Sequence, residues 1–172
     1  MDIKIVKVGY LEANCYVLTK DNQTIIIDPG DDFLKIKEVI SNEVIGILCT
    51  HSHFDHIGAL GSVKEYYQAP VYSFENINSN KLEIGSFKFE VIKTPGHSYD
   101  SVSYLIDDKL FCGDFIFASS IGRTDLPTGS MKEMQESINK ILKYPDYLIV
   151  YPGHGNITTL GKEKDSLNFF FT

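Results

Sequence analysis

Three features are scarce in this sequence, and each scarcity excludes a class of protein. No stretch of the 172 residues approaches the roughly 18 consecutive apolar residues of a membrane-spanning helix. Lys and Arg number 16 against 23 Asp and Glu, and the net charge of −7 argues against a nucleic-acid partner, because phosphate binding needs a clustered basic face. The three cysteines, Cys15, Cys49 and Cys112, lack the spacing of a disulfide framework, so we expect reduced, buried thiols.

The chain is expected to form one domain over residues 1–172, because this length buries about 70% of the unfolded surface. No repeat, low-complexity segment or linker interrupts it. The segment Met1–Lys7 alternates charged and apolar residues, which predicts a first strand rather than a signal peptide. We therefore expect a cytoplasmic protein.

The hydrophobic pattern predicts an α/β fold with two sheets and helices outside them. The cluster Asp28-Pro29-Gly30 breaks the first run of strands, Asp107-Asp108 predicts a hairpin turn, and Ser130 with Glu133 has a capping-box pattern. The predicted strands cover residues 2–8, 14–19, 24–28, 44–50, 70–73, 81–84, 87–93, 101–106, 109–113 and 146–151. The predicted helices cover residues 32–42, 57–67, 130–143 and a short C-terminal segment.

The most informative stretch is His51-Ser52-His53-Phe54-Asp55-His56, which packs four metal-binding side chains into six residues. Because His51 and His53 are two apart, they point the same way from a strand or an extended loop, and away from each other on a helix. The apolar run 44–50 before them predicts a buried strand. These ligands would therefore occupy a loop at the carboxyl end of a strand, where sheets covered by helices hold ligands.

Further ligand-type residues follow other predicted strands in glycine-containing turns, namely His97, Asp114 and His154. Four loops that converge on one sheet edge predict a metal site. Imidazole and carboxylate ligands suit zinc, with iron and manganese as rivals. Seven ligands are too many for one tetrahedral ion, whereas one shared carboxylate divides them into two sites of four. Two ions that share a water would polarise a carbonyl and lower the pKa of the attacking water.

These residues resemble a known family. The motif at 51–56, Thr94-Pro95-Gly96-His97, Gly113-Asp114 and Pro152-Gly153-His154-Gly155 are similar to the successive motifs of the metallo-β-lactamase superfamily. The resemblance covers essentially the whole chain. Residues 117–127 resemble the glyoxalase II-like (hydroxyacylglutathione hydrolase-like) hydrolases. The resemblance implies a four-layer αβ/βα sandwich of two mixed sheets, with helices on the outer faces and the site at one edge.

The resemblance also implies two divalent metal ions, with zinc as the expected metal. The implied ligands of the first ion are His51, His53 and His97, and those of the second are Asp55, His56 and His154. Asp114 is the implied bridging ligand.

The implied reaction is hydrolysis of a thioester of the hydroxyacylglutathione type, or a related ester, by a metal-bridging hydroxide. Asp55 and Asp114 would be its catalytic residues. Asp28 matches a buried aspartate that supports the metal loops.

The chain departs from glyoxalase II enzymes in two respects. Those enzymes have an additional helical domain that supplies much of the glutathione contact, and we expect none here. Tyr99-Asp100 replaces the usual Pro-Gly after the His97 motif. The resemblance implies that Arg123 binds a substrate carboxylate, a role that an arginine fork suits, against the alternative of a solvated loop arginine. Tyr99 is a second candidate for substrate contact, against the alternative of an exposed loop tyrosine. The partner is thus a small-molecule thioester or ester, and a homodimer is left open.

Several rival functions share this ligand set. A persulfide-oxidising sulfur dioxygenase has the same fold and would use one iron on His51, His97 and Asp114, although the complete second ligand set favours the hydrolase. A lactonase keeps all seven ligands and stays open. A true β-lactamase is disfavoured because that branch is exported and commonly has Cys in place of Asp114. A zinc-stabilised scaffold is disfavoured because structural zinc sites are closed and usually thiolate-rich.

Overall fold

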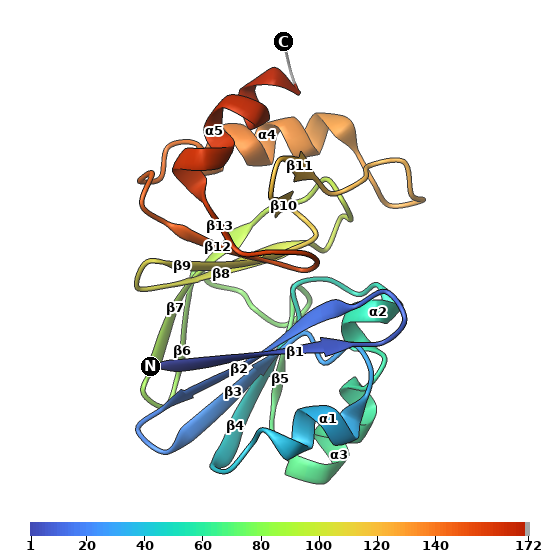
Figure 1. Cartoon of the computed structure of the whole chain (residues 1–172), viewed down its shortest axis with the longest axis vertical. Helices are drawn as coiled ribbons and strands as arrows, with labels where there is room; N and C mark the ends of the chain where they lie inside the picture. Colours follow the sequence, from blue (N-terminus) through green and yellow to red (C-terminus); the bar gives the residue numbers. More distant parts are fainter. Residues whose placement is uncertain (171–172) are drawn as a thin grey trace.

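Two sheets packed face to face carry helices on their outer faces (Figure 1), as the computed structural model of residues 1–170 shows. Helices α1 (Phe33–Glu38) and α3 (Leu60–Tyr67) lie on one side of the sheet pair. Helices α4 (Met131–Ile141) and α5 (Leu160–Phe169) lie on the other. This arrangement confirms the predicted four-layer αβ/βα fold class. Within the described residues, no helix is long and apolar enough to cross a membrane.

Both sheets are mixed. The first has the order β1 (Asp2–Val8), β2 (Ala13–Lys20), β3 (Gln23–Ile27), β4 (Glu43–Leu48) and β5 (Val71–Tyr72), and its last three strands are parallel. The second has the order β13 (Thr158–Thr159), β12 (Ile149–Pro152), β9 (Lys109–Gly113), β8 (Val102–Ile106), β7 (Phe87–Lys93) and β6 (Lys81–Ile84). Only its β12–β9 pair is parallel.

The alternation of strand side chains separates the hydrophobic interior into layers. In β3, Ile25 and Ile27 point between the two sheets, where they join Phe111 of β9. Ile26 points to the opposite face and packs with the α1 and α3 side chains. A third cluster packs α4 and α5 onto the outer face of the second sheet. A strand buried on both faces is apolar without interruption, which explains the run Ile25-Ile26-Ile27.

The predicted helix at 57–67 is wrong in its extent. The chain forms a short helix α2 (Phe54–Ile57), which carries Asp55 and His56, and then the separate α3. The break has a physical cause, because the backbone N–H of Ala59 donates to the carbonyl of Pro29 at 3.0 Å instead of continuing the first helix. The predicted helix at 32–42 is likewise too long, since α1 ends at Glu38.

Smaller differences occur elsewhere. Ser130 caps α4 by accepting from the N–H of Glu133 at 3.2 Å, but its own N–H donates to the carbonyl of Gly96, so only half of the capping box forms. The strand predicted at 146–151 begins at Ile149. The hairpin β10 (Ile116–Phe117) and β11 (Ser120–Ile121), together with β13, was not predicted.

Candidate metal centre

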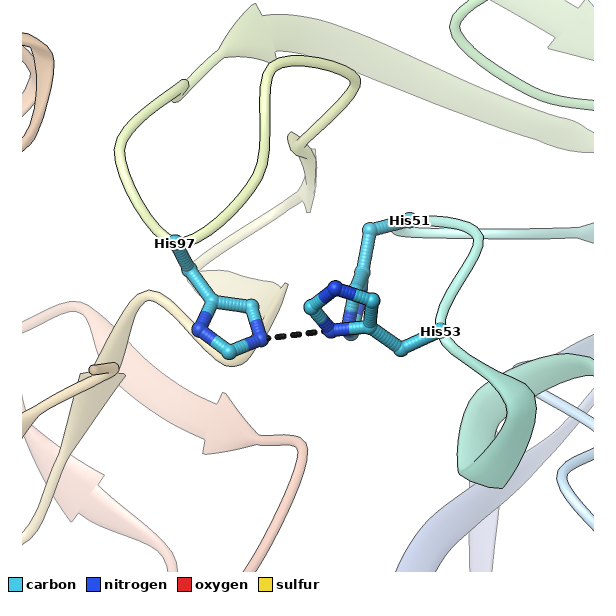
Figure 2. A group of neighbouring side chains, drawn as sticks. All are labelled: His51, His53 and His97. Carbon is cyan, nitrogen blue, oxygen red and sulfur yellow. Dashed lines mark hydrogen bonds between the residues drawn. The ribbon is translucent and has the colours of Figure 1, made fainter. Parts of the chain in front are cut away.

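Three histidines converge from two loops at one end of the sheets. His51 and His53 follow β4, as expected of ligands at the carboxyl end of a strand, and His97 follows β7. Their ligand atoms lie within 4.8 Å of one another. Figure 2 shows the rings of His53 and His97 turned toward each other, with Nε2 of His97 2.8 Å from Nδ1 of His53. These three side chains could hold one metal ion.

A second group adjoins the first and comprises Asp55, His56 and His154, whose ligand atoms also lie within 4.8 Å of one another. Nε2 of His154 is 3.1 Å from Asp55 Oδ2 and 3.4 Å from Nε2 of His56. His154 follows β12 and is 99 residues from Asp55 in the sequence, so only the fold brings them together.

Asp114 lies between the two groups. Its Oδ1 is 3.3 Å from Nε2 of His56, and its Oδ2 is 3.5 Å from Nε2 of His97. One carboxylate therefore contacts a member of each group, which is the position that a bridging ligand needs. The structure thus brings all seven expected ligands together, including this shared one.

In four of the histidines, the ring nitrogen Nδ1 points away from the centre and makes a hydrogen bond with another group of the protein. Nδ1 of His97 is 2.8 Å from the carbonyl oxygen of Arg123, and Nδ1 of His154 is 3.0 Å from that of Leu11. A carbonyl oxygen only accepts, so in both rings Nδ1 carries the proton. In the neutral rings Nε2 then presents a lone pair to the centre, as a metal ligand requires.

Asp28, which is almost fully buried, orients the rings of His56 and His51, the first directly and the second through Thr50. Its Oδ2 is 2.9 Å from Nδ1 of His56 and accepts from the Thr50 hydroxyl at 2.6 Å. Its Oδ1 accepts from the Thr50 N–H at 2.7 Å. The Thr50 hydroxyl also lies 3.0 Å from Nδ1 of His51. The Asp28 carboxylate therefore orients one ligand of each candidate group, His56 directly and His51 through Thr50. Because Asp28 faces the outer nitrogens, its position suits support of the ligands and not a third metal site.

The electrostatics of the buried rings of His51 and His56 differ. Burial, followed by repulsion from the other histidines, lowers the pKa of His51 well below its usual value, so this ring is neutral. Burial also acts to lower the pKa of His56, but Asp114 and Asp28 outweigh it and raise that pKa to about 10. Two buried carboxylates thus favour a positive charge at His56, which is the environment that suits a cation.

The donor set fits divalent metal ions on three observations. Nε2 of His51 and Oδ1 of Asp114 are buried and make no hydrogen bond within the described part of the chain, although buried polar atoms are rarely left so. Nε2 of His56 and Nε2 of His154 lie 3.4 Å apart with carboxylate oxygens of Asp55 and Asp114 beside them, so a cation placed there would be within reach of all four side chains. The donors are five imidazoles and two carboxylates with no thiolate, which zinc, iron and manganese all accept.

A cavity of about 570 Å³ opens over this centre. Arg123 lines it, as expected for a substrate-binding residue, but its side chain is engaged by Asp125 at 2.7 and 2.8 Å. Tyr99 does not line the cavity. Its ring is about half exposed and contacts the edge of Phe74, and its contact with substrate stays a prediction.

Sequence reasoning missed several contributors. Thr50 stands directly before His51, and that adjacency was the available signal. The carbonyls of Leu11 and Arg123 could not be predicted as contacts of His154 and His97. Every residue has a carbonyl, and only the fold determines which ones lie beside the histidines. Cys112, which precedes Asp114 by two residues, points into the outer core and contacts the carbonyl of Ile116, so it takes no part in the centre. All three cysteines are free and buried, as expected.

The sequence profile of the metallo-beta-lactamase superfamily matches residues 8–79 and 74–154. The chain therefore belongs to this superfamily. It is 36% identical to the probable metallo-hydrolase YqgX of Bacillus subtilis, over 94% of each protein. It is 30% identical to the hydroxyacylglutathione hydrolase GloC of Haemophilus influenzae, over 98% of each protein.

Solved structures agree on the fold. The B3 metallo-beta-lactamase BLEG-1 matches with a TM-score of 0.89 at 36% identity, over 99% of this chain and 100% of that chain. ETHE1 from Myxococcus xanthus matches with a TM-score of 0.88 at 28% identity, over 97% of this chain and 83% of that chain. TTHA1623 in a di-iron-bound form matches with a TM-score of 0.86 at 30% identity, over 96% and 99%.

Proposed function

We propose that this protein is a dinuclear metal-dependent hydrolase that cleaves thioesters of the glyoxalase II type, or related esters. The observation that carries the proposal is the position of Asp114 between two complete ligand groups. A single-ion site would need only one of these groups. The likeness to a hydroxyacylglutathione hydrolase over nearly the whole length of both proteins supports the thioester substrate.

Each part of the chain has a role in this proposal. Two bound divalent cations, with zinc as the expected metal, would lower the pKa of a water and polarise the thioester carbonyl. His51, His53 and His97 would hold one ion, and Asp55, His56 and His154 would hold the other. Asp114, which lies between the two groups, would serve both.

Asp55 is half-buried at the cavity wall, where its carboxylate can orient the attacking water by accepting a hydrogen bond from it. Burial acts to raise the pKa of Asp55, but the bond from His154 and the charge on His56 lower it to about 2, so the carboxylate is ionised at neutral pH. Leu11 and Phe54 give the same cavity an apolar wall.

The test is hydrolysis of S-lactoylglutathione by zinc-loaded protein, with metal content measured beside it. We expect turnover in the wild type and a loss of at least about 100-fold in His53→Ala, because a metal ligand is removed. Asp114→Ala should lose metal as well as activity. Asp21→Asn is the control, since Asp21 is exposed in the β2–β3 turn. If Asp114→Ala still bound two ions per chain, the assignment of Asp114 as the bridging ligand would be wrong. If the wild-type protein did not hydrolyse thioesters, the proposed substrate class would be wrong.

One second function has a specific observation behind it, which is the likeness to ETHE1 and to a di-iron protein. An iron-dependent persulfide dioxygenase would use His51, His97 and Asp114 on one ion. Oxygen uptake by iron-loaded protein with glutathione persulfide would favour it over the hydrolase. Nitrocefin and a lactone belong in the same substrate panel, because a β-lactamase is also among the similar structures.

A further inference from the structure

Apart from the candidate metal ligands, the cavity over the metal centre has one positively charged side chain. Among its lining residues, Arg123 is the one arginine or lysine, while Asp55 and Asp114 are carboxylates. Outside the cavity lining, Asp125 engages the Arg123 guanidinium through both of its carboxylate oxygens, with Nε to Oδ1 at 2.7 Å and an Nη2 to Oδ2 at 2.8 Å. This is the fork-to-fork geometry with which arginine binds a carboxylate.

The Arg123–Asp125 pair stays charged over the working pH range. The hydrogen bond from Arg123, followed by a backbone hydrogen bond, lowers the pKa of Asp125 to about 2, and Asp125 in turn raises the pKa of Arg123. The two charges cancel, and two of the three guanidinium nitrogens are already used. A substrate carboxylate that approached Arg123 would have to displace Asp125 or meet its repulsion.

The remaining cavity wall is apolar. Leu11, Phe54, Leu126 and Pro127 line it, and Phe54 is 75% exposed although it is a large hydrophobic side chain. Leu11 and Phe54 also line an adjoining cavity of about 200 Å³ toward Gly9 and Tyr10. Exposed apolar surface of this extent, placed against a reactive centre, is suited to a hydrocarbon group.

We propose that Asp125 is a specificity-determining residue, which neutralises Arg123 so that the site accepts thioesters with an uncharged, apolar acyl chain and discriminates against acyl chains that end in a carboxylate. The inference rests on the proposed function and specifies its substrate class. It replaces the expectation that Arg123 binds a substrate carboxylate, because the chain supplies that carboxylate itself.

The test compares two thioesters of N-acetylcysteamine, an uncharged thiol. The hexanoyl and adipoyl thioesters have six-carbon acyl chains that differ only in a terminal methyl or carboxylate. We expect the wild type to prefer the hexanoyl substrate in kcat/KM. Asp125→Asn keeps the side-chain shape but frees the positive charge, so it should raise the adipoyl-to-hexanoyl ratio by about two- to fivefold, the range expected for an exposed ion pair. The activity on the hexanoyl substrate should stay within about twofold.

Asp21→Asn is the matched control, since it removes the same charge from an exposed turn at the far end of β2 and should leave the ratio unchanged. Adding Arg123→Gln to Asp125→Asn should abolish the gain. Equal metal content in all variants shows that the carbonyl of Arg123 still holds His97. An unchanged ratio in Asp125→Asn, or a wild type that prefers the adipoyl substrate, overturns the proposal.

A second measurement separates this inference from the proposed function. Titration calorimetry with the two non-hydrolysable thioethers, S-hexyl- and S-(5-carboxypentyl)-N-acetylcysteamine, reports binding without any turnover. If no thioester is hydrolysed, the thioesterase assignment fails, and the thioether titrations still decide the role of Asp125. Tighter binding of the hexyl compound by the wild type, with the difference reduced in Asp125→Asn, supports it. Equal binding of both compounds by both proteins refutes it.

Discussion

Replacing Gly153 by alanine should damage the metal centre without unfolding the protein. A β-carbon at Gly153 would lie 2.1 Å from Oδ1 of Asp114 and 2.7 Å from Cε1 of His56. The backbone cannot retreat, because the Gly153 N–H donates to the carbonyl of Gly113 and its own carbonyl accepts from Asn14, both at 2.7 Å. Gly153 is not among the residues with positive φ, so the effect comes from the methyl group and not from backbone strain.

The size of the displacement sets the expected magnitude. To reach ordinary van der Waals contact at 3.4 Å, Asp114 Oδ1 has to move by about 1.3 Å, which exceeds the tolerance of about 0.5 Å for a functional constellation. We therefore expect metal affinity to fall by at least about 10–100-fold, as happens when groups that orient a ligand are removed. Overpacking should reduce the free energy of unfolding of the metal-free protein by only about 1–3 kcal/mol.

The assay combines competitive zinc titration with thermal unfolding in the presence and absence of a chelator. Gly61→Ala is the matched control, since a β-carbon there meets nothing within 4 Å. That control lies inside α3, so it should keep wild-type metal affinity and gain up to about 1 kcal/mol of stability. Wild-type zinc affinity in Gly153→Ala would refute the close contact between this glycine and the bridging carboxylate.

Two further predictions concern buried groups. Asp28→Asn should lower metal affinity by about 10–100-fold while the chain stays folded, because one carboxylate oxygen becomes an N–H₂ donor and can no longer serve both Thr50 and the Nδ1–H of His56. The spectrum of the cobalt-substituted protein should change, and a spectrum and affinity identical to wild type would contradict this role. The three thiols should react with Ellman's reagent at less than about 1% of the rate of free cysteine, because burial raises their pKa values, in Cys112 to about 12. All three should react once the chain is unfolded in denaturant, and fast labelling of the native protein would disprove their burial.

Much of the fold followed from local patterns in the sequence. The apolar run 44–50 predicted β4, and the Asp107-Asp108 turn correctly joined β8 to β9. The pattern did less well where tertiary contacts override it. Leu60, Val63 and Tyr67 have helical spacing and do lie in α3. However, the carbonyl of Pro29 accepts from the N–H of Ala59, so the helix does not extend back to Ile57. No local signal announces a hydrogen bond from a loop 30 residues away.

The candidate ligands were predictable because metal binding needs particular side chains. The sequence has only 5 histidines, and their positions after strand ends placed them at one sheet edge. The orienting contacts were less predictable, since the carbonyls of Leu11 and Arg123 serve through position alone. The state of Arg123 was also hidden, because Asp125 lies two residues away in a loop and its geometry depends on that loop. Side-chain chemistry is therefore visible in the sequence, whereas the backbone geometry that directs it is not.

The distribution of these orienting contacts indicates that the centre is preformed. Four imidazoles are fixed by groups on four separate segments, which are the β1–β2 turn, the loop after β3, the loop after β4 and the loop after β11. None of these contacts needs a metal ion, because each uses the nitrogen that faces away from the centre. The fold therefore bears the entropy cost of ordering the ligands before any ion arrives. We therefore expect the chain to fold without its ions, in contrast to small zinc domains that are unfolded without theirs.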